Sequence, residues 1–94
     1  MQIDDILKQL DNADNSNKNE LENEIVKLGT SAVPVLIEQL QCSKGLKRGV
    51  VAMSLIRIGS DSVGFLKEAA SKNHEFTWVA DYLINEINSS SKAA

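Results

Sequence analysis

The 94-residue chain has little of what usually marks a secreted, metal-binding or catalytic protein. It has a single cysteine, Cys42, so no disulfide can form within the chain. Its single histidine, His74, has no second metal ligand or nucleophile at a local spacing that would form a site. The five glycines do not form a phosphate-binding loop. We therefore expect no enzyme activity, no catalytic residue, no metal site and no cofactor.

Positive charge and long apolar runs are also scarce. Ten Lys and Arg against 13 Asp and Glu give a net charge of -3, whereas nucleic-acid affinity depends on clustered cations, of which there is one group, at Lys44, Lys47 and Arg48. The N-terminus opens with acidic residues, and no apolar run approaches the roughly 18 to 20 residues of a membrane span. We expect a soluble, cytoplasmic protein that binds neither nucleic acid nor membrane.

The chain does show helical periodicity, with Ala, Leu, Ile and Val as its main apolar residues. Apolar stripes and helix-ending glycines predict an all-α fold with a loop at residues 11–16, a single domain over residues 1–88 and a flexible tail at 89–94. The six predicted helices run from about Ile3 to Leu10, Asn17 to Leu28, Ser31 to Leu40, Lys44 to Ile58, Asp61 to Ala70, and Glu75 to Asn88. Of these, the fourth is apolar nearly all round, which predicts that neighbouring helices enclose it. The fifth continues the apolar stripe in weaker form, with Lys67 at the place of Ile37. Asn17, with Glu20 three residues later, resembles a capping pair for the second helix, and we expect Thr30 or Ser31 to cap the third and Ser60 or Asp61 to cap the fifth.

The helices repeat at an interval of thirty residues. This shift places Ile6 on Leu36 and Leu36 on Leu66, and it places Gly29, which ends one helix, on Gly59, which ends another. The first, third and fifth helices therefore match one another, as do the second, fourth and sixth. Because no single pair of such helices can bury its apolar face alone, the pairs are expected to stack. A compact orthogonal bundle is the alternative, but it gives no reason for the fixed interval.

Two segments resemble a known family. LGTSAVPVLIEQL, from Leu28, and RGVVAMSLIRIGSDSVGFLKEA, from Arg48, resemble the short HEAT-like repeats of bacterial and archaeal proteins and of the phycobilisome-lyase group. The resemblance implies a right-handed α-α superhelix, a solenoid of roughly three helix pairs that acts as a protein-interaction platform. It does not imply lyase activity. The sequence departs from the family pattern at Gly64, where a proline is usual, and at Val50 and Val51, where alanines are usual.

The resemblance also assigns the first, third and fifth helices to the concave face of the superhelix. Val35 and Phe65 place apolar side chains there, and Glu38 and Glu68 flank them. One interpretation is a groove for a partner peptide or helix. The other is that single exposed apolar residues are ordinary and that Phe65 folds over to help pack the fifth helix.

The last helix carries a second anomaly. Trp78 and Tyr82 lie four residues apart on the face that should be polar, because an end repeat shields the stack from water. Trp and Tyr are enriched at interface hot spots, so this face predicts contact with a partner or a homodimer through the C-terminal helix. Alternatively, the two rings lie over exposed core.

These patterns predict a non-enzymatic protein-protein interaction module, a small HEAT-repeat scaffold or adaptor. Its partner is expected to be another protein, a peptide or a second copy of the chain. An accessory subunit of an enzyme complex, lyase-like by family analogy alone, is the alternative.

Overall fold

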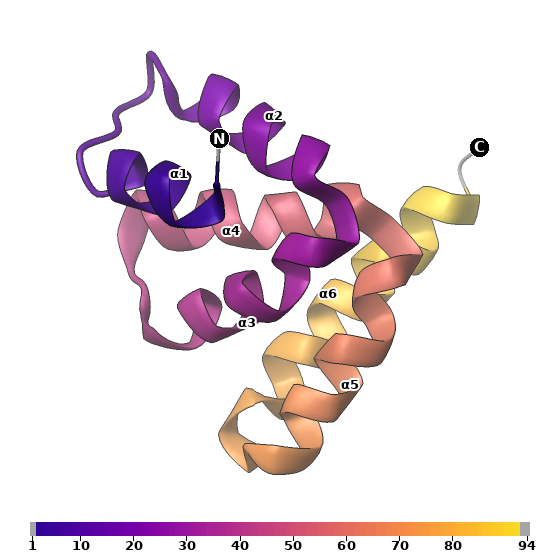
Figure 1. Ribbon diagram of the computed structural model, residues 1–94. Coiled ribbons are helices and arrows are strands. Elements are labelled where there is room, and N and C mark those ends of the chain that lie inside the picture. The colour runs from indigo at the N-terminus through magenta and orange to yellow at the C-terminus, as the bar shows by residue number, and fades with distance from the viewer. Residues whose placement is uncertain (1, 93–94) are drawn as a thin grey trace.

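The computed structural model describes residues 2–92, and this part of the chain contains helices and no strand (Figure 1). The all-α prediction is confirmed. The α-helices are α1 (Ile3–Leu10), α2 (Lys18–Leu28), α3 (Val33–Cys42), α4 (Gly45–Ile58), α5 (Val63–Lys72) and α6 (Thr77–Lys92), and three short 3-10 helices are η1 (Gly29–Ala32), η2 (Gly59–Ser62) and η3 (His74–Phe76). Because η1 and η2 connect their neighbours without a non-helical residue, the described chain forms four continuous helical segments, α1, α2–α3, α4–α5 and α6, and not six separate helices.

The predicted loop between the first two helices covers Asp11 to Asn17 and is held by its own polar side chains. The Asp14 carboxylate accepts a hydrogen bond from the backbone N–H of Ser16 at 2.9 Å and another from the Ser16 hydroxyl. Asn17 was expected to cap α2, but its side-chain oxygen accepts from the backbone N–H of Asp14 at 3.0 Å. The predicted cap is therefore wrong, because the turn uses that oxygen first.

Gly29 and Gly59 end α2 and α4 in a backbone conformation that side chains strongly disfavour. Their φ angles are 65° and 89°, a region that glycine occupies at little cost. The expected capping of α3 by Thr30 or Ser31, and of α5 by Ser60 or Asp61, does not occur. Instead, the 3-10 turns carry backbone hydrogen bonding directly into the next helix, which removes the need for a side-chain cap.

Helix α6 extends four residues beyond the predicted end at Asn88, to Lys92. Residues 93 and 94 of the predicted tail lie outside the described part of the chain. At its other end, α6 follows the 3-10 turn η3, which includes His74 and Glu75 and buries Phe76.

Helix α4 is the central element. It packs against α2, α3 and α6, while α1 packs on α2, and α5 packs on α6 and α3 (Figure 1). The described chain is compact, with a radius of gyration of 12.6 Å and extents of 32 × 31 × 22 Å. Helices α1 to α4 form one part of the molecule, and α5 and α6 extend from it as an adjacent pair (Figure 1).

Burial follows the thirty-residue interval. The three matching residues Ile6, Leu36 and Leu66 are each 0% exposed, and each comes from a different pair of helices. Leu66 is the only buried residue of α5, which agrees with the weaker apolar stripe predicted there. The sequence repeat is therefore also a repeat in the positions that form the core.

Helix α4 differs from its prediction, because it is not enclosed on all sides. Met53 is 48% exposed, and Arg48 and Gly49 are also exposed. Helices α2, α3 and α6 cover three directions around α4 and leave a strip of its surface uncovered. An apolar composition alone could not show this strip.

One stretch, Gly45–Lys72, is long and apolar enough to cross a membrane by length and composition. The stretch is not one uninterrupted apolar run, because charged residues such as Arg57 and Asp61 lie within it. In the structure the stretch is divided between α4 and α5 at the Gly59 turn, and Arg57 and Asp61 lie on either side of that turn. Length and composition alone do not distinguish a span from packed helices of this kind.

Candidate protein-interaction surface

The most exposed large apolar side chains of the described residues lie on α6 and α4. Trp78 is 70% exposed, Tyr82 is 58% exposed and Met53 is 48% exposed. Trp78 and Tyr82 form one wall of a groove of about 390 Å³, here called the α4–α6 groove. Its lining comes from Leu40 of α3, from α4 and from α6: Gly45, Arg48, Gly49, Ala52, Trp78, Val79, Tyr82 and Leu83.

The periodicity of α6 explains why its aromatic residues face outward. Ala80, Leu83 and Ile87 are buried and turn one side of the helix toward the core. Trp78 and Tyr82, four residues apart, lie together on a different side. Since α6 ends the succession α2, α4 and α6, no further helix of the described chain covers that side.

Small residues on α4 leave the groove open. Gly49 has no side chain, and a Cβ atom placed there would meet no atom within 4 Å. Ala52 lies three residues further along the same helix and contributes only a methyl group to the lining. The floor is apolar, because Leu40 and Leu83 beneath it are buried. A ligand backbone could therefore approach α4 closely between the aromatic side chains and the helix.

A second groove lies beside the first, between α2 and α4. It has a volume of about 510 Å³, and its lining includes Met53 and Val50 of α4 and polar residues of α2. Gly49 lines both grooves. A shift of 29 residues places Gly49 on Trp78 and Met53 on Tyr82, so the exposed strips of α4 and α6 are equivalent positions of the repeat.

Among the residues that the structure describes, Arg48 is the only charged one that lines the α4–α6 groove. Within the described chain, its guanidinium makes no ion pair or hydrogen bond, whereas the neighbouring Lys47 pairs with Asp11 at 2.8 Å. The first turn of α4 has no acidic residue, and no side chain caps it. The unpaired guanidinium and the positive end of the α4 dipole therefore make this end of the groove electropositive.

The four candidate residues of the predicted concave groove are not brought together. Phe65 and Glu68 line a cavity of about 340 Å³ between α3 and α5, but Val35 and Glu38 are not among its lining residues. Val35 and Phe65 are both partly buried and pack against the core. Glu68 is exposed and pairs with Lys72 of the same helix at 3.0 Å. The side chains of Val35 and Phe65 are therefore less exposed than those of Trp78 and Tyr82.

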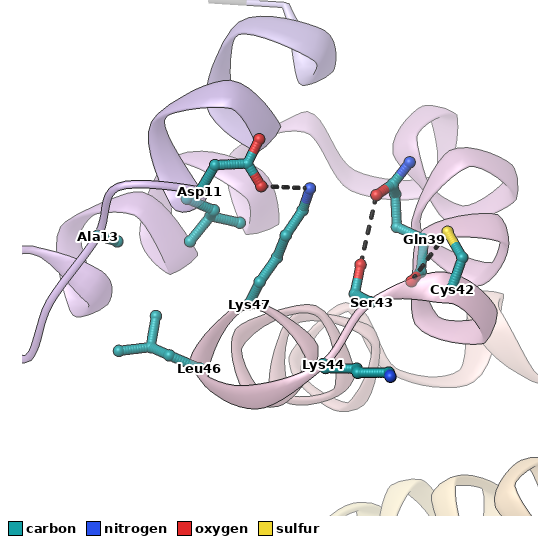
Figure 2. Close-up of a pocket in the computed structure, with 9 residues that line it drawn as sticks. Asp11, Ala13, Gln39, Cys42, Ser43, Lys44, Leu46 and Lys47 are labelled. Atoms are coloured by element: carbon teal, nitrogen blue, oxygen red, sulfur yellow. Dashed lines mark hydrogen bonds and ion pairs between the residues drawn. The ribbon is translucent and has the colours of Figure 1, made fainter.

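A further cavity, of about 460 Å³, lies where α1, α3 and α4 meet (Figure 2). The ion pair between Asp11 and Lys47 and the hydrogen bond from the Ser43 hydroxyl to the Gln39 side chain lie at its edge (Figure 2). Cys42 is exposed there, and its thiol donates to the backbone carbonyl of Gln39 at 3.7 Å. The residues that the structure describes contain no group of three side chains suited to hold a metal ion.

Comparison of the chain with family models, curated proteins and solved structures finds no match.

Sequence reasoning found Trp78 and Tyr82 but missed the side chains opposite them. The apolar composition of α4 predicts that neighbouring helices enclose it, and this prediction does not single out Arg48, Gly49 or Ala52. The 29-residue register could have identified Gly49, which is equivalent to Trp78, but not Arg48 or Ala52, which are equivalent to Thr77 and Asp81.

Proposed function

We propose that this protein is a protein-interaction module that binds its partner at the α4–α6 groove. The observation that carries the proposal is the exposure of Trp78 and Tyr82 side by side on α6. Exposed aromatic residues lower solubility, and Trp and Tyr are among the residues that contribute most binding energy at protein interfaces. A groove with a buried apolar floor beside them offers a place for a partner's side chains.

We further propose that the fold is a short HEAT-like solenoid, a right-handed superhelix. Two features support it. Three pairs of helices that match in the repeat are neighbours, since α2 contacts α4, α4 contacts α6, and α3 contacts α5. The matching residues Ile6, Leu36 and Leu66 are all buried, as stacked repeats require.

Polar contacts between successive repeats also support the solenoid. The Thr30 hydroxyl donates to the Asp61 carboxylate at 2.9 Å, which joins the η1 turn to the equivalent η2 turn. The Asn73 amide donates to the Gln41 side chain at 2.8 Å and joins the ends of α5 and α3. Each contact links positions 31 or 32 residues apart, close to the repeat length. A cytoplasmic location, the absence of enzyme activity and an accessory role in an enzyme complex stay predictions.

Affinity capture with matched variants tests the binding proposal. Wild type, Trp78→Ser and Lys67→Ser would be used as baits, because Lys67 is exposed on another helix and lies outside the groove. We expect a set of proteins to be recovered with wild type and Lys67→Ser and to be lost with Trp78→Ser. Recovery of the same proteins with all three baits would remove the α4–α6 groove as the binding surface.

A further inference from the structure

We infer that the natural occupant of the α4–α6 groove is a short amphipathic helix of a partner protein, with an acidic residue placed to pair with Arg48. This inference rests on the proposed function and specifies the chemistry of the partner. It follows from the extent of the groove, from its charge and from the area of exposed apolar surface.

The extent of the groove suits two turns of helix. Its lining along α4 runs from Gly45 to Ala52, which corresponds to about 10 Å of helix length. Apolar side chains at i, i+3 or i+4, and i+7 of a partner helix would extend over that length and face the groove together. The volume of about 390 Å³ accommodates such anchors between the ring of Trp78 and the bare backbone at Gly49.

The charge of the groove selects an acidic partner. Arg48 is exposed and unpaired in the described chain, and it is the only charged side chain in the lining. Lys44, at the N-terminal boundary of α4, is also exposed and has no ion pair among the described residues. A carboxylate on the partner can pair with the Arg48 guanidinium through two parallel hydrogen bonds. A cation at the same place would be repelled by both side chains.

The apolar area that Trp78 and Tyr82 expose is smaller than a stable dimer of this chain would need to bury. Trp78 and Tyr82 together expose on the order of 300 Å², since an aromatic side chain buries about 150 to 250 Å² when fully covered. Stable interfaces bury about 800 Å² per partner, of which roughly 450 Å² is apolar. A single docked helix requires less area than a folded subunit, so the surface fits a peptide segment better than a homodimer.

A displayed library of helical peptides of about 16 residues, long enough to support a helix, tests the inference. Peptides that bind wild type would be selected, and those that also bind Trp78→Ser would be removed. The strongest remaining binder would be synthesised in two forms, one with its acidic residues and one with lysine in their place. We expect enriched sequences to carry spaced apolar residues with Asp or Glu. The lysine form should bind wild type about threefold to tenfold more weakly, a difference that shrinks as salt is added.

Variants of the protein complete the test. Arg48→Glu should reverse the preference between the two peptides, and Arg48→Gln should weaken it, because Lys44 stays exposed at the start of α4. Lys67→Glu, which changes an exposed charge on α5, should leave the preference unchanged. Since Arg48 is exposed and unpaired, these variants are expected to fold, and circular dichroism would check that they do.

The outcomes separate this inference from the function on which it rests. Peptides that need Trp78 but bind equally in acidic and lysine forms would overturn the inference and leave the proposed function standing. A library that yields no Trp78-dependent binder would overturn both. Concentration-dependent chemical shifts around Trp78 without any peptide would show a second copy in the groove, and they would also overturn the inference.

Discussion

At the scale of single residues, the glycines of this chain have two opposite roles. Gly29 and Gly59 adopt positive φ angles at the ends of α2 and α4, where they allow the chain to enter the next helix. Gly49 and Gly64 lie within helices, and a Cβ atom at either position would meet nothing within 4 Å. The same substitution should therefore change the free energy of unfolding in opposite directions at the two kinds of position.

Gly59→Ala should lower the free energy of unfolding by roughly 1 to 3 kcal/mol, because alanine is strained at this backbone conformation. Gly49→Ala should raise it by about 0.5 to 1 kcal/mol, because glycine inside a helix costs about that much relative to alanine. Urea denaturation of the two variants and wild type measures both changes. Equal effects at the two positions would contradict the backbone geometry described for Gly59.

The pKa of the Asp14 carboxyl group should lie below its ordinary value of 3.8. The hydrogen bonds from the hydroxyl and backbone N–H of Ser16 favour the charged form and lower the pKa of Asp14. A depressed pKa in the folded state contributes stability above pH 3.8, and this contribution is lost as pH falls through the folded pKa. NMR titration of the Asp14 side chain in wild type and Ser16→Ala checks this, with the variant expected to have the higher pKa.

A pKa for Asp14 that is the same in both proteins would show that the hydroxyl does not contribute. The matched control is Ser60→Ala, which removes an exposed hydroxyl from the η2 turn and should leave the titration unchanged.

At the scale of elements, periodicity and helix-ending residues predicted most helix boundaries but not the environments of the helices. The α1 boundaries matched, and Gly29 and Gly59 end α2 and α4 as expected. The junctions after them were wrong, because a four-residue 3-10 turn replaces the expected caps. Periodicity reports which side of a helix is apolar, whereas the exposure of Met53 depends on where the neighbouring helices lie.

The packing of α4 predicts a contrast between two buried positions. Leu55 is 0% exposed at the centre of the core, so Leu55→Ala should lower the free energy of unfolding by about 2 to 5 kcal/mol. Ser62 is also buried, and its hydroxyl donates to the Leu55 carbonyl at 3.1 Å. That carbonyl also accepts from the Gly59 N–H, and the equivalent position in η1 is Ala32. Ser62→Ala should therefore cost less than about 1 kcal/mol.

Chemical denaturation, monitored by circular dichroism, measures the loss in the free energy of unfolding for both variants. A loss for Ser62→Ala as large as that for Leu55→Ala would mean that the hydroxyl is required at the α4–α5 junction. This result would contradict the equivalence of the two turns.

At the scale of the whole molecule, the aromatic pair was predictable from the sequence and the groove was not. The repeat register showed that Trp78 and Tyr82 were out of pattern on a terminal helix. The groove also needs Arg48, Gly49 and Ala52 of α4, which lie about thirty residues earlier in the chain and face it only after α4 and α6 pack together. Long-range packing of this kind leaves no local signal.

The free chain should be a monomer at micromolar concentration, because the exposed aromatic surface is smaller than the apolar surface that stable dimers bury. Light scattering after size exclusion should give a mass near 10.3 kDa for wild type, Trp78→Ala and Tyr82→Ser alike. A doubled mass for wild type that returns to the monomer value in Trp78→Ala would favour a homodimer through α6.

The central claim is that Trp78 is open to solvent in the free protein and becomes covered by a partner. Trp78 is the only tryptophan, so its fluorescence reports on the α4–α6 groove alone. The direct measurement is acrylamide quenching of the free chain and of the chain saturated with the selected acidic peptide. We predict efficient quenching in the free chain, close to that of a small tryptophan amide, and a severalfold decrease on binding. Weak quenching in the free chain, or quenching that the bound peptide leaves unchanged, would contradict the account.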